Sequence, residues 1–282
     1  MKQRLITAAL ILLITTPLVI FSQFITYPIA LSLLSVIAIY EVTRVLKIEK
    51  EFALGIPAYL VAAAFPFSAF FITDNSTVYL LALAAIMFTY LIYVMGVAVF
   101  KRGKLAFPLI SELFMMVTYV VVSFSSMSVV RYIDRSVGLY VLIIVFVVAW
   151  VTDSGAYIVG SLFGKHKLIP EVSPKKTVEG AIGGIVMAFC AMLVYGLIID
   201  LFIEGITVNY LSLGIMAPIL SVVSQLGDLF ASLLKREHNI KDYGNLFPGH
   251  GGVMDRFDSN LAVSTILLIL IQVLPLPPFV AG

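Results

Sequence analysis

The sequence predicts an all-α integral membrane protein with about nine transmembrane helices. Of its 282 residues, 61% are hydrophobic and 12% are charged, and the mean hydropathy is +1.08. These values lie far outside the range of soluble globular proteins. The apolar runs also reach the roughly 20 residues that a helix needs to cross the hydrocarbon core. The placement of the basic residues, considered below, agrees with this fold class.

Nine apolar runs are expected to form the spans, and they cover residues 5–22, 28–46, 53–72, 77–99, 106–126, 137–160, 179–202, 211–233 and 260–280. The break between the first two runs is weak, so a kink near Pro28 is an alternative to two separate helices. A cleavable signal peptide over residues 1–22 is a second alternative. No A-x-A-like cleavage site follows that run, which favours a retained span.

The basic residues test this count of spans independently. With the N-terminus in the cytoplasm, nine spans place all of the 18 Lys and Arg residues except Arg131 and Arg135 on the cytoplasmic side. Lys and Arg accumulate in cytoplasmic loops because they resist translocation. An error of one span would scatter the basic clusters over both sides. We therefore expect a cytoplasmic N-terminus and a C-terminus on the opposite side.

The chain is expected to form a single polytopic membrane domain over residues 1–282. Residues 1–130 hold the N-terminal spans, and residues 137–282 hold the catalytic spans with two enlarged cytoplasmic loops, 161–180 and 235–258. No internal repeat, low-complexity tract or soluble domain is visible in the sequence. The one cysteine, Cys190, lies inside an apolar run, which excludes disulfides and thiolate zinc sites within the chain.

Four carboxylates lie inside predicted spans at similar depth: Glu41, Glu112, Asp153 and Asp228. At 1.5 Å rise per residue, each lies on the order of 10–18 Å from the nearest basic loop edge. Ionisable residues inside spans usually face a cavity or a partner. This favours a functional role for Asp153 and Asp228. For Glu41 and Glu112 the sequence leaves a purely structural role open.

Asp255 and Asp258 are three residues apart at the start of the last span, so they share a helix face. Stabilisation by the helix dipole is the structural alternative for both carboxylates. Gly251 and Gly252 precede them, and Asp228 is available on the preceding span. Oxygen ligands without thiols or clustered histidines suit Mg²⁺, which is typically held by one or two carboxylates and substrate phosphates. The pattern therefore favours a magnesium site.

The first large loop has the character of a phosphate site. Hydroxyl and ammonium groups in the run Ser173 to Thr177 stand just before Glu179 and a new helix, and helix N-termini bind phosphate. The G-x-x-x-x-G-K-[ST] pattern of a P-loop is absent. The positive-inside rule alone explains Lys165 and Lys167. We expect the run 173–177 to contact a triphosphate.

The second large loop is the most polar passage of the chain. It reads SLLKREHNIKDYGNLFPGHGGVMDRFD from Ser232 to Asp258. His250 is flanked by two glycines, where the backbone can approach a ligand closely. The sequence leaves three roles open for His250: phosphate contact, acid–base chemistry, or fixing the loop. His166 and His238 are expected to be loop surface residues.

The run from Ser232 to Asp258 resembles the signature of phosphatidate cytidylyltransferases, also called CDP-diacylglycerol synthases, without departing from it. The upstream runs V-T-D-S-G-A-Y (151–157), G-K-H-K (164–167) and S-P-K-K-T-V-E-G (173–180) resemble the same family. Ser154 is often Thr there and Val178 often Trp, which affects only local nucleotide contacts. The likeness covers residues 150–260, and the first five spans share only their hydrophobicity.

This resemblance implies that the chain transfers a cytidylyl group from CTP to phosphatidic acid, which gives CDP-diacylglycerol and pyrophosphate. It implies Asp228 and Asp255 as ligands of a catalytic Mg²⁺, with Asp258 and Asp153 as further ligands and a second metal ion as an option. The nucleotide-binding loop would hold Ser173, Lys175, Lys176 and Thr177. The residues that would meet phosphates of CTP or of the lipid are Lys235, Arg236, Lys241, His250 and Arg256. Family members are typically homodimers in bacterial inner or comparable membranes.

Two other functions remain as alternatives. One is a different membrane transferase acting on lipid phosphates, although the D-G-x-x-A-R…G-x-x-x-D-x-x-x-D pattern of CDP-alcohol phosphotransferases is absent. The other is an ion-coupled secondary transporter that uses the intramembrane carboxylates. Such transporters usually show paired repeats and interrupted spans, which this sequence lacks.

Overall fold

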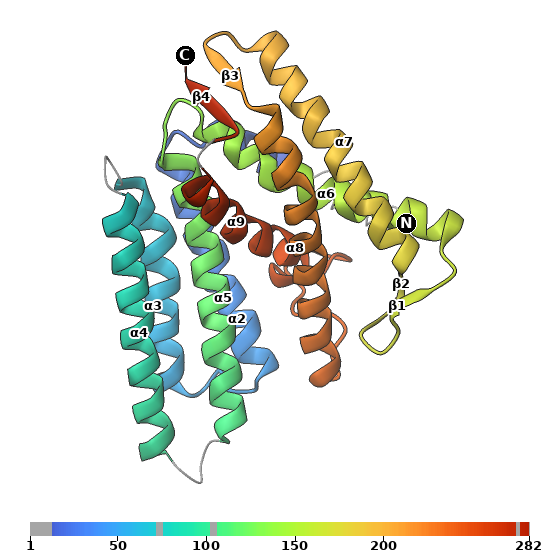
Figure 1. Ribbon diagram of the computed structural model, residues 1–282. Coiled ribbons are helices and arrows are strands. Elements are labelled where there is room, and N and C mark those ends of the chain that lie inside the picture. Colours follow the sequence, from blue (N-terminus) through green and yellow to red (C-terminus); the bar gives the residue numbers. More distant parts are fainter. Residues whose placement is uncertain (1–12, 72–75, 102–105, 275–276, 282) are drawn as a thin grey trace. The chain divides into compact units, whose positions relative to one another are not determined.

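The computed structural model of the chain describes residues 13–71, 76–101, 106–274 and 277–281 (Figure 1). Within these ranges eight α-helices are long and apolar enough to cross a membrane, which confirms the predicted all-α membrane fold. They correspond to the last eight predicted spans. Of the first predicted span, residues 13–20 are helical, and residues 5–12 lie outside the described residues.

The chain forms two compact units that are described separately here. Unit 1 comprises Met1–Ile133 and Ile240–Arg256, and unit 2 comprises Asp134–Asn239 and Phe257–Gly282. The second large loop of the sequence therefore belongs mostly to the same unit as the N-terminal spans. The sequence-based expectation of one membrane domain stays a prediction.

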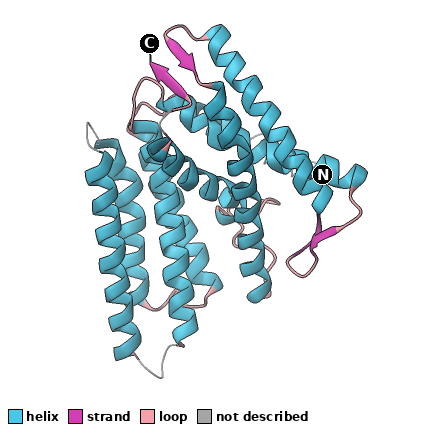
Figure 2. Cartoon of the chain, in the orientation of Figure 1, coloured by secondary structure: helices cyan, strands magenta, loops and turns pink. Residues whose placement is uncertain are grey.

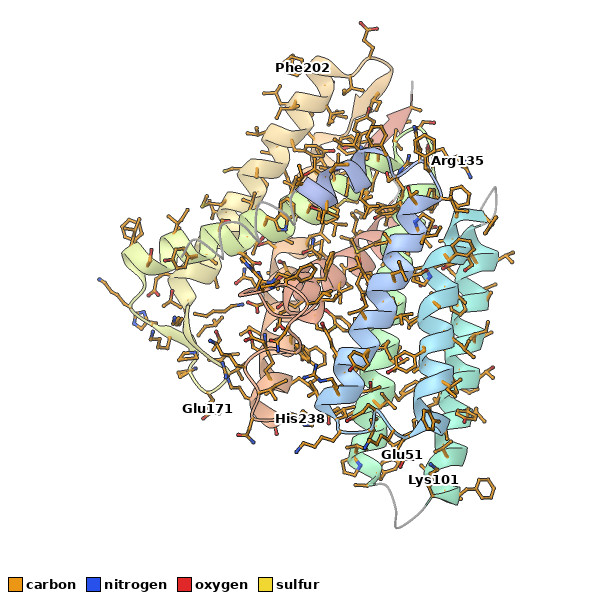
Figure 3. All side chains as sticks on the ribbon, turned by 180° about the vertical axis from the view of Figure 1, so that it is seen from behind. Glu51, Lys101, Arg135, Glu171, Phe202 and His238 are labelled. Atoms are coloured by element: carbon orange, nitrogen blue, oxygen red, sulfur yellow. The ribbon has the colours of Figure 1, made fainter. Side chains whose placement is uncertain are left out.

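Unit 1 is built from four long helices and one short 3-10 helix. They are α2 (Thr26–Val45), α3 (Phe52–Ser68), η1 (Ala69–Phe71), α4 (Ser76–Phe100) and α5 (Phe107–Tyr132). Helices α2, α3 and α5 contact one another, and α4 packs against α3 and α5. Glu51 and Lys101 form an ion pair at one end of this unit, with Oε2 and Nζ 2.5 Å apart (Figure 3).

Helix α5 extends to Tyr132, beyond the predicted end of its span at residue 126. Its last turn holds Arg131, which is buried although the sequence places it in a loop. The Arg131 Nε donates a hydrogen bond to Ser22 Oγ at 2.7 Å, and the Tyr132 hydroxyl donates to the Ser22 carbonyl at 2.8 Å. Hydrogen bonds from the Arg131 Nε and from the Tyr132 hydroxyl inside the unit let the helix continue, which hydropathy alone does not reveal.

Unit 2 contains three complete long helices, most of a fourth, and four short strands. The helices are α6 (Gly138–Phe163), α7 (Val178–Phe202), α8 (Tyr210–Glu237) and α9 (Met254–Val273), whose first three residues belong to unit 1. The strands are β1 (Lys167–Ile169), β2 (Ser173–Thr177), β3 (Ile206–Val208) and β4 (Phe279–Ala281). They form two antiparallel pairs, β1–β2 and β3–β4 (Figure 2). The sequence did not predict these pairs, because strands this short carry little periodic signal.

The prediction of a last span over residues 260–280 is wrong at both ends. Helix α9 begins at Met254 and ends at Val273, and residues 279–281 form strand β4. Strand β4 pairs with β3, in the connection between α7 and α8, and buries Phe279 against the rings of Tyr140 and Tyr195. The sequence has prolines at positions 275, 277 and 278, which explain the early end, since proline does not continue a helix.

Helices α6 and α7 pack closely because glycines face the partner helix. A Cβ built on Gly184 would lie 2.8 Å from the Thr152 carbonyl oxygen, and one on Gly183 would lie 2.4 Å from Val159 Cβ. Small residues let membrane helices approach until their backbones are in van der Waals contact. The two helices that flank the β1–β2 hairpin are therefore held together along their length.

Candidate active site

Thr177 fixes the point where strand β2 becomes helix α7. It is the N-cap of α7, and its Oγ1 accepts a hydrogen bond from the Gly180 backbone N–H at 3.1 Å. Gly160, Gly164 and Gly180 surround it so closely that a Cβ on any of them would lie less than 3.0 Å from Thr177 Oγ1. The run of Lys175, Lys176 and Thr177 is thus held at a helix N-terminus, where backbone N–H groups favour phosphate.

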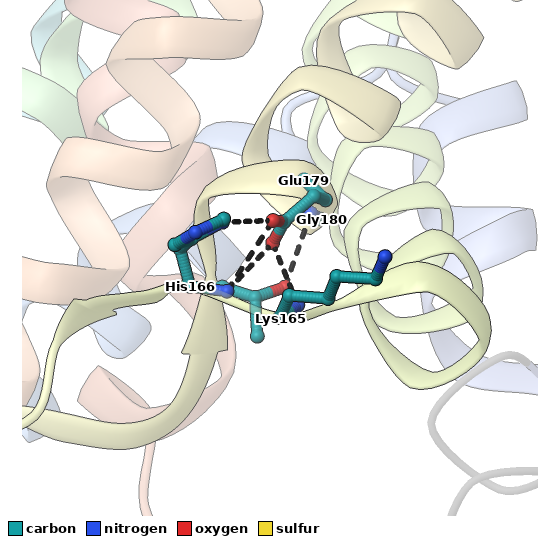
Figure 4. A network of polar contacts seen from close by, with 5 residues as sticks. Lys165, His166, Glu179 and Gly180 are labelled. Atoms are coloured by element: carbon teal, nitrogen blue, oxygen red, sulfur yellow. Dashed lines mark hydrogen bonds and ion pairs between the residues drawn. The ribbon is translucent and has the colours of Figure 1, made fainter.

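Glu179 closes the other end of the hairpin (Figure 4). Its carboxylate accepts hydrogen bonds from the backbone N–H of Lys165 at 3.0 Å and of His166 at 3.2 Å, and its Oε1 lies 2.6 Å from His166 Nδ1. His166 is exposed, as the sequence predicts, but it also pairs with Glu179, which the sequence did not predict. The first turn of α7 therefore anchors both ends of the β1–β2 hairpin.

A cavity of about 410 Å³ opens beside this hairpin within unit 2. It combines ammonium groups with two of the predicted intramembrane carboxylates, Asp153 and Asp228. Lys176 Nζ lies 2.6 Å from Asp228 Oδ2, and both side chains are half-buried. The polar lining residues are Asp153, Tyr157, Ser161, Lys167, Lys175, Lys176, Thr177, Gln225 and Asp228. The cavity presents cationic groups for an anion and carboxylates for a cation.

Asp258 adds a third carboxylate to the same unit. It interacts electrostatically with Asp228, Asp153 and Lys235. Its Oδ1 accepts a hydrogen bond from the Ser259 backbone N–H at 2.8 Å, while Ser259 Oγ lies 3.4 Å from Asp153 Oδ2. Helices α6, α8 and α9 thus each supply one acid to this region of unit 2.

Gly227 permits the close approach of α8 and α9. A Cβ at this position would lie 2.6 Å from the Asp258 carbonyl oxygen and 2.8 Å from the Ala262 Cβ. The glycine directly before Asp228 therefore brings the backbones that carry Asp228 and Asp258 together. Any larger residue would push these two carboxylates apart.

The carboxylates do not by themselves supply a full set of metal ligands. Across residues 13–71, 76–101, 106–274 and 277–281, no group of three His, Cys, Asp or Glu side chains is arranged to hold a metal ion. Mg²⁺ usually keeps several waters and substrate phosphate oxygens among its ligands. The ammonium of Lys176 against Asp228 shows that this carboxylate accommodates a cation.

The polar loop of unit 1 folds around a second cavity, of about 430 Å³. Phe247 and Gly251 form an isolated antiparallel bridge, and Gly249 and Gly251 have φ of 77° and 84°, which L side chains rarely adopt. His250 Nδ1 is buried without a hydrogen-bond partner in the described part of the chain. The lining residues are Lys241, Asp242, Asn245, Gly249, His250, Gly251 and Arg256. Lys241 and Arg256 outnumber Asp242, the one carboxylate of this lining, so the cavity suits an anion.

Two carboxylates hold this loop from within unit 1. Asp255 Oδ2 accepts hydrogen bonds from the backbone N–H of Tyr243 at 2.7 Å and of Gly252 at 2.9 Å. Glu41, from helix α2, accepts hydrogen bonds from the backbone N–H of the residues on either side of the loop–helix junction. Asp255, a predicted metal ligand, therefore also has a structural task in the loop.

The predicted site residues divide between the two units. Unit 2 holds Asp153, Ser173, Lys175, Lys176, Thr177, Asp228, Lys235, Arg236 and Asp258. Unit 1 holds Lys241, His250, Asp255 and Arg256. Of the unit 2 residues, Ser173, Lys235, Arg236 and Asp258 do not line the cavity of that unit, and Arg236 Nε instead donates to the Val172 carbonyl at 3.3 Å. Of the unit 1 residues, Asp255 does not line the loop cavity.

Sequence reasoning missed four polar residues that line the unit 2 cavity: Tyr157, Ser161, Lys167 and Gln225. Lys167 was explained by membrane topology alone, and topology does not reveal that a hairpin turns the side chain toward a cavity. Gln225 gave a usable signal, because a polar residue one helical turn before Asp228 inside a span shares its face. The Gln225 amide nitrogen donates to the Ala181 carbonyl at 3.1 Å, which ties α8 to α7.

Known proteins resemble the chain over nearly its whole length. The model of the cytidylyltransferase family matches residues 2–274. The phosphatidate cytidylyltransferase of Staphylococcus haemolyticus is 37% identical over 273 residues, which cover 96% of this chain and 99% of that protein. That of Bacillus subtilis is 35% identical over 274 residues, covering 96% of this chain and 97% of that protein. A chain matched at this identity and extent belongs to the cytidylyltransferase family.

Proposed function

We propose that the protein transfers the cytidylyl group of CTP to phosphatidic acid, forming CDP-diacylglycerol and pyrophosphate. The observation that carries this is the unit 2 cavity, in which lysines at the N-terminus of α7 face carboxylates from α6 and α8. Phosphates prefer the lysines at the helix N-terminus, and a magnesium ion prefers the carboxylates. A nucleotide bound together with magnesium would use both kinds of group.

In this reaction an oxygen of the lipid phosphate attacks the α-phosphorus of CTP. The bond from that phosphorus to the oxygen bridging to the β-phosphate breaks, and pyrophosphate leaves with the electron pair. The attacking phosphate is already ionised, so no strong general base is required. The barrier arises from bringing two polyanions together and from charge on the departing pyrophosphate. Lys167, Lys175 and Lys176 would offset that charge in the unit 2 cavity.

We assign the candidate magnesium ligands of unit 2 to Asp228, Asp258 and Asp153, while a metal-binding role for Asp255 of unit 1 stays an expectation of the family resemblance. Their oxygen donors and the cation already paired with Asp228 fit this ion. When bound, Mg²⁺ would neutralise the phosphate oxygens and stabilise the leaving pyrophosphate. Lys176 would then be released from Asp228 to a phosphate oxygen.

The unit 1 cavity would take a phosphate group through Lys241, His250 and Arg256. His250 Nδ1, buried and without a protein partner in the described ranges, is suited to donate a hydrogen bond to a phosphate oxygen. This supports phosphate contact among the three roles that the sequence left open for His250.

The apolar helices make this a multi-pass membrane protein. We propose that it lies in the cytoplasmic membrane with both cavities facing the cytoplasm, where aqueous CTP meets the lipid headgroup. This agrees with the distribution of Lys and Arg along the sequence. A homodimer, as is typical of the family, is proposed as the functional form.

The direct test follows CTP consumption by the full-length protein in detergent with phosphatidic acid and Mg²⁺. We expect CDP-diacylglycerol and pyrophosphate in equal amounts, and loss of turnover when EDTA removes the metal. Failure of every lipid phosphate to accept the cytidylyl group would refute the proposal. Protection from heating by CTP in preference to ATP would separate this enzyme from the alternative of an ion-coupled transporter.

Replacing Lys176 with methionine should raise KM for CTP roughly 10- to 30-fold, about the effect of losing one charge-assisted hydrogen bond. Methionine retains most of the aliphatic stem but removes the ammonium that lines the cavity and pairs with Asp228. Steady-state kinetics at varied CTP would measure this. Lys50→Met, in an exposed loop of unit 1, is the control and should leave KM unchanged. An unchanged KM in Lys176→Met would remove Lys176 from the nucleotide site.

A further inference from the structure

Glu41 makes an unusual long-range contact within unit 1. Its Oε1 accepts a hydrogen bond from the Val253 backbone N–H at 2.9 Å, and its Oε2 accepts one from the Met254 N–H at 3.0 Å. These donors stand at the start of α9, where backbone N–H groups have no partner within the helix. Glu41 as a whole is 4% exposed. Both oxygens are thus used to cap a helix that lies more than 200 residues later in the sequence.

The same carboxylate explains two glycines of the loop. A Cβ on Gly252 would lie 2.2 Å from Glu41 Oε1, and one on Gly244 would lie 2.5 Å from the same atom. Neither glycine has positive φ, so backbone conformation does not require glycine there. The close approach of Glu41 does. Gly249 and Gly251, by contrast, are glycines because of their φ angles.

Glu41 does not line the loop cavity, but it contacts two stretches of the loop that lines it. The lining residues run from Lys241 to Arg256, and Glu41 contacts the loop at Gly244 and from Gly252 to Met254. Asp255 joins the same two stretches from inside, through the N–H groups of Tyr243 and Gly252. The two carboxylates together tie the beginning of the loop to its end.

We propose that Glu41 is a positioning residue, which holds the loop 241–256 in the shape that brings Lys241, His250 and Arg256 around one anion. This assigns the N-terminal spans a part in the reaction, although they carry none of the family's motif residues. The assignment rests on the proposed cytidylyl transfer for its effect on turnover. The contact itself is testable without any substrate.

The kinetic test compares Glu41→Ala and Glu41→Gln with wild type in the full-length protein. Glu41→Ala should lower kcat about 30-fold because two hydrogen bonds to a buried carboxylate are lost. Glu41→Gln should lower it about 5-fold, because one amide oxygen still accepts while the amide nitrogen faces an N–H. KM for CTP should change by less than about 3-fold, since unit 2 residues alone line the nucleotide cavity. Glu51→Gln, another carboxylate of unit 1, should match wild type.

The structural test introduces Gly252→Ala into wild type and into Glu41→Ala. Hydrogen–deuterium exchange of residues 243–254 is then measured in each variant. Gly252→Ala alone should speed exchange in this segment about 10-fold or more, because its methyl group displaces the Glu41 carboxylate. Added to Glu41→Ala, it should change exchange by less than about 2-fold, because the clash is already gone. Exchange in α7 should stay as in wild type in every variant.

The outcomes separate the two proposals. Equal effects of Gly252→Ala in the two backgrounds would overturn the Glu41 contact, whatever the enzyme does. Coupled exchange with unchanged kcat would overturn the positioning role. If wild type makes no CDP-diacylglycerol, the proposed function fails, and the exchange data alone then decide the contact. Glu41→Gln, which retains one hydrogen bond, supplies the result if Glu41→Ala does not fold.

Discussion

Asp228→Asn should lower kcat/KM on the order of 1,000-fold, the largest loss expected from any single change in this chain. Asparagine has nearly the shape of aspartate but cannot carry the charge that pairs with Lys176 at 2.6 Å or attract a magnesium ion. Asp258, in electrostatic contact with Asp228, remains but does not replace it. Initial rates over a range of Mg²⁺ concentrations would measure the loss.

The matched control for this change is Asp200→Asn. Asp200 lies near the C-terminal end of α7, accepts a hydrogen bond from the Tyr210 hydroxyl at 3.2 Å, and does not line the cavity. It should retain wild-type kcat/KM. Full activity in Asp228→Asn, or an equal loss in both variants, would show that Asp228 has no special part in the chemistry.

Gly180→Ala should cost about 1–3 kcal/mol of stability and lower kcat/KM on the order of 100-fold. The added Cβ would lie 2.6 Å from the Ala156 carbonyl oxygen and 2.9 Å from Thr177 Oγ1. A backbone oxygen of a packed helix cannot move aside cheaply, so α6 and α7 must separate. Because Thr177 caps α7 at this point, the separation displaces the lysines that line the cavity. Thermal unfolding and CTP kinetics would report the two effects.

Gly96→Ala is the control for Gly180→Ala. Gly96 lies inside helix α4, and a Cβ built there meets nothing within 4 Å. In an open helical position, alanine is favoured over glycine by roughly 0.5–1 kcal/mol. The midpoint of unfolding should therefore stay equal or rise. A matching loss of stability in both variants would contradict the close α6–α7 contact.

The helices of this protein could be predicted because the membrane imposes a simple length and hydropathy rule. Residues 178–202 and 210–237 were located nearly to their ends on that basis. The rule fails where polar groups are satisfied inside the fold. Arg131 lies in the last turn of α5 because Ser22 receives its hydrogen bond, and no local pattern encodes that partner.

The charged residues of the candidate site could be predicted from the sequence, but the contacts that hold them in position could not. Asp153 and Asp228 stood out as carboxylates inside apolar spans, and Lys175 and Lys176 as ammonium groups just before one. All four line one cavity. Glu41 stood out as an intramembrane carboxylate, but its role could not be predicted, because its partners are two backbone N–H groups far away in the sequence. Backbone groups carry no residue identity, so a contact to them leaves no motif to recognise.

The β3–β4 pair has a practical consequence for anyone who attaches a label to this protein. Asn209 N donates to the Pro278 carbonyl at 2.9 Å, and Phe279 packs against Tyr140 of α6 and Tyr195 of α7. Strand β4 therefore braces the two helices, α6 and α7, that supply residues to the unit 2 cavity. A fluorescent or affinity tag should leave residues 277–281 in place and be joined through a flexible spacer. A fusion that replaces residues 279–281 would remove this brace and weaken the enzyme it was meant to report on.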